Sequence, residues 1–209
     1  MGTHASALAS EIIANNKYVN IIARREYDNT ILNLLTKLSN RLDWRSIDGI
    51  TFLDNDNVIE NKDAEYILDL DSLPFVSEVY SRHLKLENYF YGHVRYPMVS
   101  IFTSRGCNAR CSYCLYPQTM FGNFRERSPK SIADEFQWVV SHLPKVKEIL
   151  IDDDTFTMNK AHARAVSEEL IKINNKLPWT CEARGNLDYD TLYAMKKAGC
   201  RLIVTGFES

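Results

Sequence analysis

The sequence predicts an α/β fold with a parallel sheet in its second half, and three observations carry that prediction. Short apolar, β-favouring runs alternate with runs of helical apolar spacing from residue 98 onward. Each predicted strand is followed by polar residues, and three closely spaced cysteines follow the first one. Alternation of this kind is typical of parallel α/β architectures, in which reactive residues lie on loops at the carboxyl ends of the strands.

The elements of the second half follow one another in strand–helix order. A strand over 98–103 leads directly into the cysteines. Ser128 and Pro129 favour the start of a helix, and Gly199 favours the end of another. The pattern predicts helices over 130–143, 160–176 and 188–198, and further strands over 146–151, 179–183 and 201–206.

The first half has a different organisation. It contains an amphipathic helix around Leu8–Ile13, a short strand over 19–23 and a helix around Ile31–Leu38. Two short strands, 49–53 and 58–60, can pair across an Asp-Asn-Asp-Asn turn. We therefore expect a first domain over 1–70, a linker over 71–97 that is rich in aromatic and basic residues, and a second domain over 98–209.

The three cysteines, Cys107, Cys111 and Cys114, have the spacing C-x3-C-x2-C. Three thiolates can hold three irons of a 4Fe–4S cluster, whose usual complement is four Cys, so the fourth iron stays open for another ligand. Zinc is an alternative, but structural zinc takes four ligands in paired spacings, and Cys181 and Cys200 stand singly. Chance is the other alternative, at roughly three chains of this composition in a thousand.

Polar residues also follow the other three predicted strands. Asp152, Asp153 and Asp154 follow the second, Arg184 follows the third, and Glu208 follows the fourth. Because the carboxyl ends of parallel strands share one edge of a sheet, we expect these side chains to face the cysteine loop. The alternatives are a solvated turn that caps the next helix for the aspartates and a structural ion pair for Arg184.

The stretch 98–209 resembles the front part of the radical S-adenosylmethionine (radical SAM) enzymes. Their CxxxCxΦC motif corresponds here to Cys107, Cys111, Tyr113 and Cys114. The resemblance implies a partial radical SAM (β/α) barrel of about four strands. It also implies that the amino and carboxylate groups of S-adenosylmethionine chelate the open iron. One electron from the reduced cluster then breaks a carbon–sulfur bond and gives a 5′-deoxyadenosyl radical.

The same resemblance implies particular contacts with S-adenosylmethionine. Tyr113 corresponds to a position beside the adenine or the cluster. Asp152 and Asp153 stand where the family usually has Gly-Gly-Glu, which meets the methionine ammonium, and the sequence does not choose between them. Arg184 is placed to meet the carboxylate, and Glu208 to approach the ribose or the methionyl group.

The first half resembles the subgroup of radical SAM enzymes that carry a cobalamin-binding domain ahead of the barrel. Gly2-Thr3-His4-Ala5, Arg25-Glu26-Tyr27-Asp28 and Leu70-Asp71-Ser72-Leu73-Pro74 stand for its three characteristic segments. This implies the C-terminal half of a Rossmann-like cobalamin-binding domain, in which Thr3 and His4 are candidates for contact with cobalamin. Arg25 and Glu26 are expected to hold the domain together. Both domains resemble only part of their counterparts, so we expect an internal piece of a longer polypeptide.

Within this subgroup the sequence is most similar to radical SAM enzymes of hopanoid biosynthesis. The tracts 114–119, 152–157, 181–186 and 199–209 carry that likeness. It implies radical chemistry on an unactivated carbon, with a hopanoid lipid side chain as substrate. Cobalamin-dependent methylases and tetrapyrrole cyclases share these tracts in looser form. Methyl transfer and cyclisation are therefore alternative reactions. A non-catalytic fragment that only binds a cluster is the alternative of another class.

The composition indicates which classes of partner the protein can bind. The net charge is −2 and the sequence pI about 6.2, so no basic surface for nucleic acid is expected. No apolar run reaches the roughly 20 residues of a membrane span. An odd number of cysteines with a cluster spacing favours a reducing, cytoplasmic compartment over a disulfide framework. We expect a small-molecule or lipid substrate and a reducing partner such as flavodoxin or ferredoxin.

Overall fold

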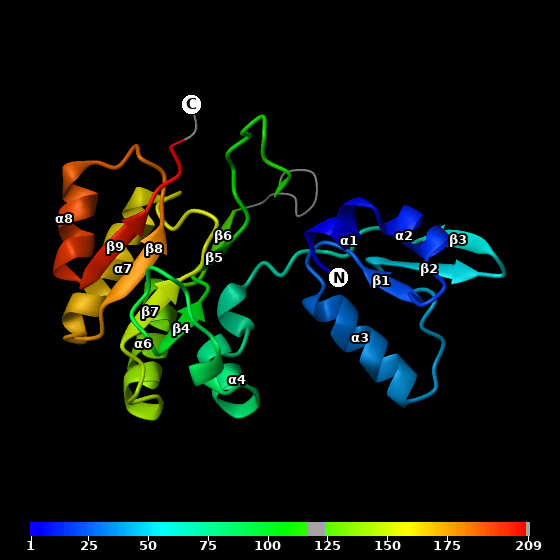
Figure 1. Ribbon diagram of the computed structural model, residues 1–209, viewed down its shortest axis with the longest axis horizontal. Helices are drawn as coiled ribbons and strands as arrows, with labels where there is room; N and C mark the ends of the chain where they lie inside the picture. The colour runs from blue at the N-terminus through cyan, green and yellow to red at the C-terminus, as the bar shows by residue number, and fades with distance from the viewer. Residues whose placement is uncertain (117–123, 208–209) are drawn as a thin grey trace. The chain divides into compact units, whose positions relative to one another are not determined.

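The computed structural model describes residues 1–116 and 124–207, and these form two compact units. The first unit comprises residues 1–67 and 109–122, of which 117–122 lie outside the described residues. The second comprises residues 68–108 and 123–209. Figure 1 shows the helices and strands of both units, and each unit is described by itself.

The second unit is built on a four-stranded parallel sheet in the order β4-β7-β8-β9. Its strands are β4 (Met98–Ile101), β7 (Glu148–Ile151), β8 (Trp179–Glu182) and β9 (Cys200–Val204). The helices α6 (Pro129–His142), α7 (Lys160–Lys172) and α8 (Tyr189–Lys197) connect them. The predicted α/β fold with a parallel sheet is therefore confirmed, and every predicted strand and helix of this half is present.

The three helices cover one face of this sheet (Figure 1), where they bury the main hydrophobic core. Trp179 and Phe136 are fully buried there, and the ring of Phe156 lies edge-on to Trp179 at 5.5 Å. Alternate strand residues face the other side, because successive side chains of a strand point to opposite faces. On that side Met98 and Leu150 pack against Val94 from the segment before β4.

The segment predicted as a linker is an integral part of the second unit. It forms two short 3-10 helices, η1 (Leu70–Ser72) and η2 (Leu86–Asn88), on either side of α4 (Val76–His83), and α4 contacts β4 and α6. The backbone N–H and the hydroxyl of buried Ser77 both donate to Glu135 of α6, at 3.1 and 2.8 Å. Aromatic and basic residues therefore do not mark a free connector here, since buried hydrogen bonds hold the segment to the sheet.

The first unit contains α1 (Thr3–Ala7), α2 (Ala9–Asn15) and α3 (Asp28–Ser39) beside the strands β1 (Ile21–Ala23), β2 (Ile50–Asp54) and β3 (Asn57–Glu60). The predicted hairpin is confirmed, with Asn55 and Asp56 at its tip at φ 46° and 65°. Both strand pairings are antiparallel, whereas a Rossmann-type domain has parallel strands. These antiparallel pairings do not support the half-Rossmann assignment of this unit, which stays a prediction.

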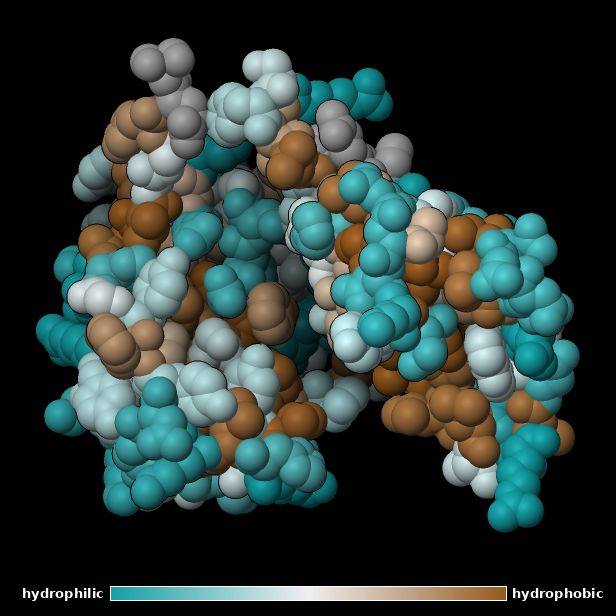
Figure 2. All heavy atoms as spheres, turned by 45° about the vertical axis from the view of Figure 1, so that its right-hand side comes forward, coloured by the Kyte–Doolittle hydropathy of each residue, from teal (hydrophilic) through white to brown (hydrophobic). Residues whose placement is uncertain are grey.

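Buried polar contacts hold the first unit together around Arg24. Its guanidinium donates to the Ile50 carbonyl at 2.8 Å and forms ion pairs with Asp63 and Glu60 at 3.3 and 3.7 Å. Arg25 pairs with Asp63 at 2.9 Å, which agrees with its expected structural role. Hydrophobic residues are also exposed on this unit, and Figure 2 shows hydrophobic atoms along its lower side. Four exposed leucines lie on or just after α3, namely Leu32, Leu35, Leu38 and Leu42.

No helix within residues 1–116 and 124–207 is long and apolar enough to cross a membrane.

Candidate active site at the carboxyl edge of the parallel sheet

The cysteine loop leaves the carboxyl end of β4, as the sequence predicts. Its stem is a two-stranded antiparallel ribbon in which β5 (Ser104–Arg105), just before the cysteines, pairs with β6 (Arg125–Glu126) on the return. The N–H of Arg127 also donates to the Thr103 carbonyl at 2.9 Å. Both ends of the loop are therefore held at the same edge of the parallel sheet.

The three motif cysteines are partly exposed and form no disulfide. Cys107 belongs to the second unit, and Cys111 and Cys114 belong to the first. Within the first unit, the Cys114 N–H donates to the Cys111 carbonyl at 3.1 Å, which closes a turn. The N–H of Tyr116 points at the Cys114 sulfur at 3.4 Å. Hydrogen bonds to the cysteine sulfurs are among the factors that set the potential of an iron–sulfur cluster.

These features fit an iron–sulfur cluster better than the zinc alternative. The donor set is three accessible thiols, one of which receives a backbone N–H, and thiolates are the ligands that such clusters require. The other cysteines, Cys181 and Cys200, are buried in the sheet. Neither can therefore complete a four-cysteine zinc site with the motif. Among the described residues no three His, Cys, Asp or Glu side chains surround a common position, and this includes the motif cysteines themselves.

The structure separates the two aspartates that the sequence does not distinguish. Asp153 is fully buried, and its carboxylate accepts four hydrogen bonds. The backbone N–H groups of Thr103 and Ser104 lie at 2.7 and 3.1 Å from Oδ1, and the two hydroxyls donate to Oδ2. Burial raises the pKa of Asp153, and these hydrogen bonds oppose the rise. Every acceptor position of this side chain is in use inside the protein.

Asp152, in contrast, is exposed at the end of β7, and its backbone N–H donates to the Ile101 carbonyl of β4 at 2.9 Å. Partial burial raises the pKa of its carboxyl. The aspartates do not cap the following helix, because the α7 N-cap is Asn159, whose side chain accepts from the N–H groups of Ala161 and His162. The capping alternative for this tract is therefore wrong.

Glu182 also lies at the carboxyl edge of the parallel sheet, and the sequence did not predict it. It ends β8, and burial together with the neighbouring charges of Asp152 and Asp154 raises its pKa, while His93 opposes the rise. The Nε2 atom of His93 is buried and has no hydrogen-bond partner among the described residues, and its ring meets Tyr91 at 4.5 Å. Strand alternation could have identified Glu182, because Trp179 and Cys181 face the helices and Glu182 therefore faces away from them.

The other predicted residues lie as follows. Arg184 is exposed two residues after β8 and forms no ion pair or hydrogen bond with another described residue, so the structural alternative has no support. Tyr113 is 64% exposed, in the first unit. Thr3 and His4 are both exposed and lie in the first turn of the short helix α1. Glu208 lies outside the described residues.

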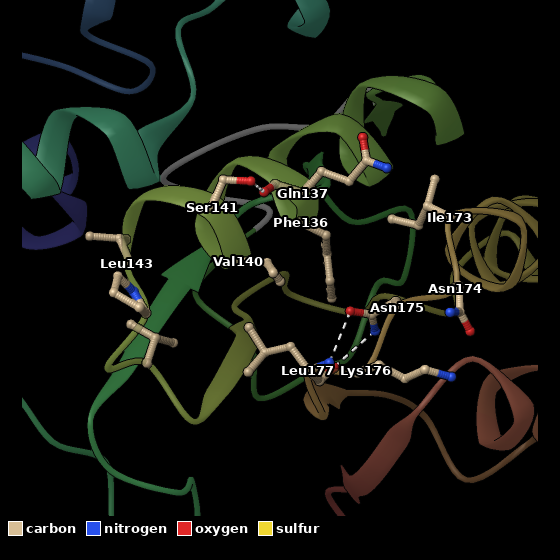
Figure 3. A pocket seen from close by; sticks show the side chains of 12 residues that line it. Phe136, Gln137, Val140, Ser141, Leu143, Ile173, Asn174, Asn175, Lys176 and Leu177 are labelled. Atoms are coloured by element: carbon tan, nitrogen blue, oxygen red, sulfur yellow. Dashed lines mark hydrogen bonds between the residues drawn. The ribbon is translucent and has the colours of Figure 1, made fainter.

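The opposite edge of the sheet has a different character. At the start of β7, buried Glu148 accepts from Arg201 Nε at 2.8 Å, from the Thr180 hydroxyl and from the Arg95 N–H at 2.7 Å. Burial tends to raise the pKa of Glu148, but these partners outweigh burial and lower it. A cavity of about 520 Å³ also lies at this edge, between the ends of α6 and α7 (Figure 3). Asn175 lines it and bonds the backbone of Leu177.

Comparison with known proteins finds a matching family model and several similar sequences. A family model described as the Radical SAM superfamily matches residues 101–209. The anaerobic magnesium-protoporphyrin IX monomethyl ester cyclase of Synechocystis sp. is 29% identical over 202 residues, which are 95% of this chain and 39% of the relative. An uncharacterized methyltransferase of Pyrococcus horikoshii is 28% identical over 192 residues, which are 91% of this chain and 40% of the relative. The chain thus spans about two fifths of these relatives.

Solved structures share the fold. The cobalamin-dependent S-adenosylmethionine radical enzyme OxsB, with aqua-cobalamin and S-adenosylmethionine bound, has a TM-score of 0.75 at 19% identity, covering 100% of this chain and 30% of its own. The radical S-adenosylmethionine methyltransferase TsrM of Kitasatospora setae, with cobalamin and a 4Fe–4S cluster bound, has a TM-score of 0.72 at 18% identity. It covers 98% of this chain and 40% of its own.

Proposed function

Because this chain belongs to the radical SAM superfamily, we propose that it cleaves S-adenosylmethionine reductively and starts radical chemistry on an unactivated carbon of its substrate. The observation that carries the proposal is the arrangement at one sheet edge. The stem of the three-cysteine loop, Asp152 and Arg184 all follow the carboxyl ends of parallel strands. A reduced 4Fe–4S cluster, when bound, supplies the electron that breaks the carbon–sulfur bond.

In this proposal the cluster is held by Cys107, Cys111 and Cys114. Asp152 binds the methionine ammonium, since its carboxyl is exposed, whereas the carboxyl of Asp153 is buried and saturated with hydrogen bonds. Arg184 binds the methionine carboxylate, because a guanidinium presents a planar fork that matches a carboxylate. Both residues follow adjacent strands, β7 and β8, so one amino-acid group can lie between them.

Three further assignments complete the proposal. Tyr113 contacts the adenine or the cluster, as the family motif implies. Glu208 contacts the ribose or the methionyl group. Thr3 and His4 contact cobalamin from the exposed side of α1.

Methyl transfer is the second candidate for the reaction that follows. An uncharacterized methyltransferase is among the relatives, and the solved neighbours include a cobalamin-dependent enzyme and a methyltransferase. Ring closure on a tetrapyrrole is favoured in the same way by the cyclase relative. A hopanoid side chain as substrate is supported only by the sequence tracts described above. A flavodoxin or ferredoxin as reductant and a cytoplasmic location follow from the reducing chemistry.

The experiment that tests this proposal is product analysis after anaerobic reconstitution with iron and sulfide. The protein is reduced with dithionite and incubated with S-adenosylmethionine, and the nucleoside products are separated by chromatography. We expect 5′-deoxyadenosine, with S-adenosylhomocysteine in addition if methyl transfer follows. Formation of neither product by cluster-loaded protein would contradict the catalytic proposal and favour a fragment that only binds the cluster.

A further inference from the structure

One connection of the chain, between β7 and α7, holds both sides of the stem of the cysteine loop. On the outgoing side, Asp153 of this connection accepts the four hydrogen bonds from Thr103 and Ser104 described above. These two residues immediately precede Arg105 and the motif. A carboxylate that binds two consecutive N–H groups and two hydroxyls fixes both the path of the backbone and the rotamers of the side chains.

On the returning side, the first turn of α7 holds β6. The side chain of His162 is 9% exposed, and its Nε2 lies 2.8 Å from the Arg127 carbonyl while its Nδ1 lies 3.3 Å from Glu126 Oε1. Asn159 donates to the other oxygen of Glu126 at 3.2 Å. The two ring nitrogens therefore face the Arg127 carbonyl and the Glu126 carboxylate on the returning side of the stem. Glu126 Oε1 is buried and has no hydrogen-bond partner among the described residues, so its contact with His162 Nδ1 is one of proximity alone.

A second anchor on the returning side comes from α6. Arg127 donates to the Phe102 carbonyl at 2.9 Å and forms an ion pair with Glu135, which is fully buried. Glu135 is in turn the residue that binds Ser77 of α4. Asp153, in contrast, is the neighbour of Asp152 in the chain. The β7–α7 connection therefore links the stem directly to the strand end proposed to bind the methionine ammonium.

We propose that Asp153 and His162 are positioning residues that hold the two ends of the cysteine loop at the strand end carrying Asp152. The inference rests on the proposed function. In this arrangement the stem of the cluster loop and the proposed ammonium site share one rigid base, so neither can shift without the other. Neither residue touches the reacting atoms.

A purely stabilising role is the alternative, and two residues of the second unit serve as controls for it: Glu148, which is as buried as Asp153, and His142, which is more exposed than His162. Glu148 is an equally buried carboxyl with charged and neutral donors, but it lies at the opposite end of β7. His142 is a histidine on α6 that stacks on Trp138 and does not contact the stem. Asp153→Asn is therefore compared with Glu148→Gln, and His162→Phe with His142→Phe.

The test uses the full chain, reconstituted and reduced, and measures the electron paramagnetic resonance spectrum and the midpoint potential of the cluster. We expect both controls to keep the wild-type spectrum and potential even where they lower stability. Asp153→Asn and His162→Phe should shift both, and should weaken the response of the spectrum to S-adenosylmethionine by about 10-fold in concentration, as is usual when partners outside the ligand set are lost.

The outcomes separate this inference from the proposed function. If wild-type protein gives a cluster signal and both stem variants match their controls in spectrum and potential, the positioning role is wrong and the proposed function stands. If wild-type protein takes up no cluster, both are wrong. Should Asp153→Asn fail to fold, His162→Phe and His162→Gln decide the matter. The Gln variant should restore part of the wild-type spectrum, because its amide can still donate one hydrogen bond.

Discussion

A buried carboxyl lies at each end of strand β7, and the two carboxyls have different partners and opposite pKa shifts. At the start, Glu148 meets the cationic Arg201 together with neutral donors, and its pKa is lowered. At the end, Asp153 meets only hydroxyls and backbone N–H groups, and its pKa is raised. At the first end, the charge of Glu148 is compensated by Arg201 inside the protein. The second end holds a loop in place beside exposed Asp152 and half-buried Glu182, so polar groups stay available for a ligand.

The largest expected effect is the loss of the iron–sulfur cluster when a motif cysteine is replaced. Cys111→Ala leaves two motif thiolates, which have little hold on a cubane cluster, so the brown absorbance of the reconstituted protein should disappear. Cys200→Ala is the control, because Cys200 is a buried cysteine at the start of β9. It should keep the full cluster content per chain. Equal iron and sulfide content in both variants would contradict the motif assignment.

Arg201→Met should have the next largest effect, at the compensated end. It leaves the Glu148 charge buried with only neutral donors, which we expect to lower the free energy of unfolding by about 3 kcal/mol, as is typical for a broken buried pair. The exposed pair of Lys130 with Asp134, at 2.7 Å, provides the control. Lys130→Met should change stability by less than about 1 kcal/mol. Urea titration measures both, and equal losses would remove the distinction between the two ends.

The sequence predicted the parallel sheet and its connecting helices well, but it did not predict that α4 packs against them. Strong apolar periodicity placed every strand of the parallel sheet and the three helices that connect them, because β7 and β8 are buried on both faces and their helices have one apolar stripe. Periodicity could not show that α4 belongs to this unit, since Ser77 is held there by a buried hydrogen bond to Glu135. Such a partner lies far away in the sequence.

The site was predicted only in part for a related reason. Spacing alone identifies the three cysteines, because their chemistry requires a local motif. Asp152 and Asp153 are adjacent and chemically identical, and only the pleat of β7 decides which one turns into the protein. The roles of Asp153 and His162 depend on β5 and β6, two-residue strands that are too short to carry a periodic signal.

A smaller effect is expected from Asp152→Asn. Removing the charge that we propose to bind the methionine ammonium should weaken S-adenosylmethionine binding by about 10-fold or more, as is typical of a lost charge-assisted hydrogen bond. Stability should change little, since the side chain is exposed. Asp190→Asn, on the exposed start of α8, should leave the dissociation constant unchanged. Calorimetric titration of reconstituted protein measures both, and an unchanged value for Asp152→Asn would remove this residue from the site.

The smallest effect is the pH dependence of stability. The lowered pKa of Glu148 contributes stability that is present above its unfolded value, near 4.5, and is lost as the pH falls through the folded value. The raised pKa of Asp153 contributes stability that is present below its unfolded value, near 3.8, and is lost as the pH rises through the folded value. The cost of Glu148→Gln should therefore grow with pH, and the cost of Asp153→Asn should shrink.

Urea titrations of wild-type protein and both variants, between about pH 3 and pH 7, measure these slopes. Slopes of the same sign in the two variants would show that the carboxyls at the two ends are not treated differently.

The most direct test of the whole account is electron paramagnetic resonance of anaerobically reconstituted, dithionite-reduced protein, with and without S-adenosylmethionine. We predict a 4Fe–4S signal that changes when S-adenosylmethionine is added, because three cysteine ligands would leave the fourth iron of a cluster open and, in our proposal, Asp152 and Arg184 bind the amino-acid group. A cluster signal that is the same with and without S-adenosylmethionine would contradict a cosubstrate site at the carboxyl edge of this sheet.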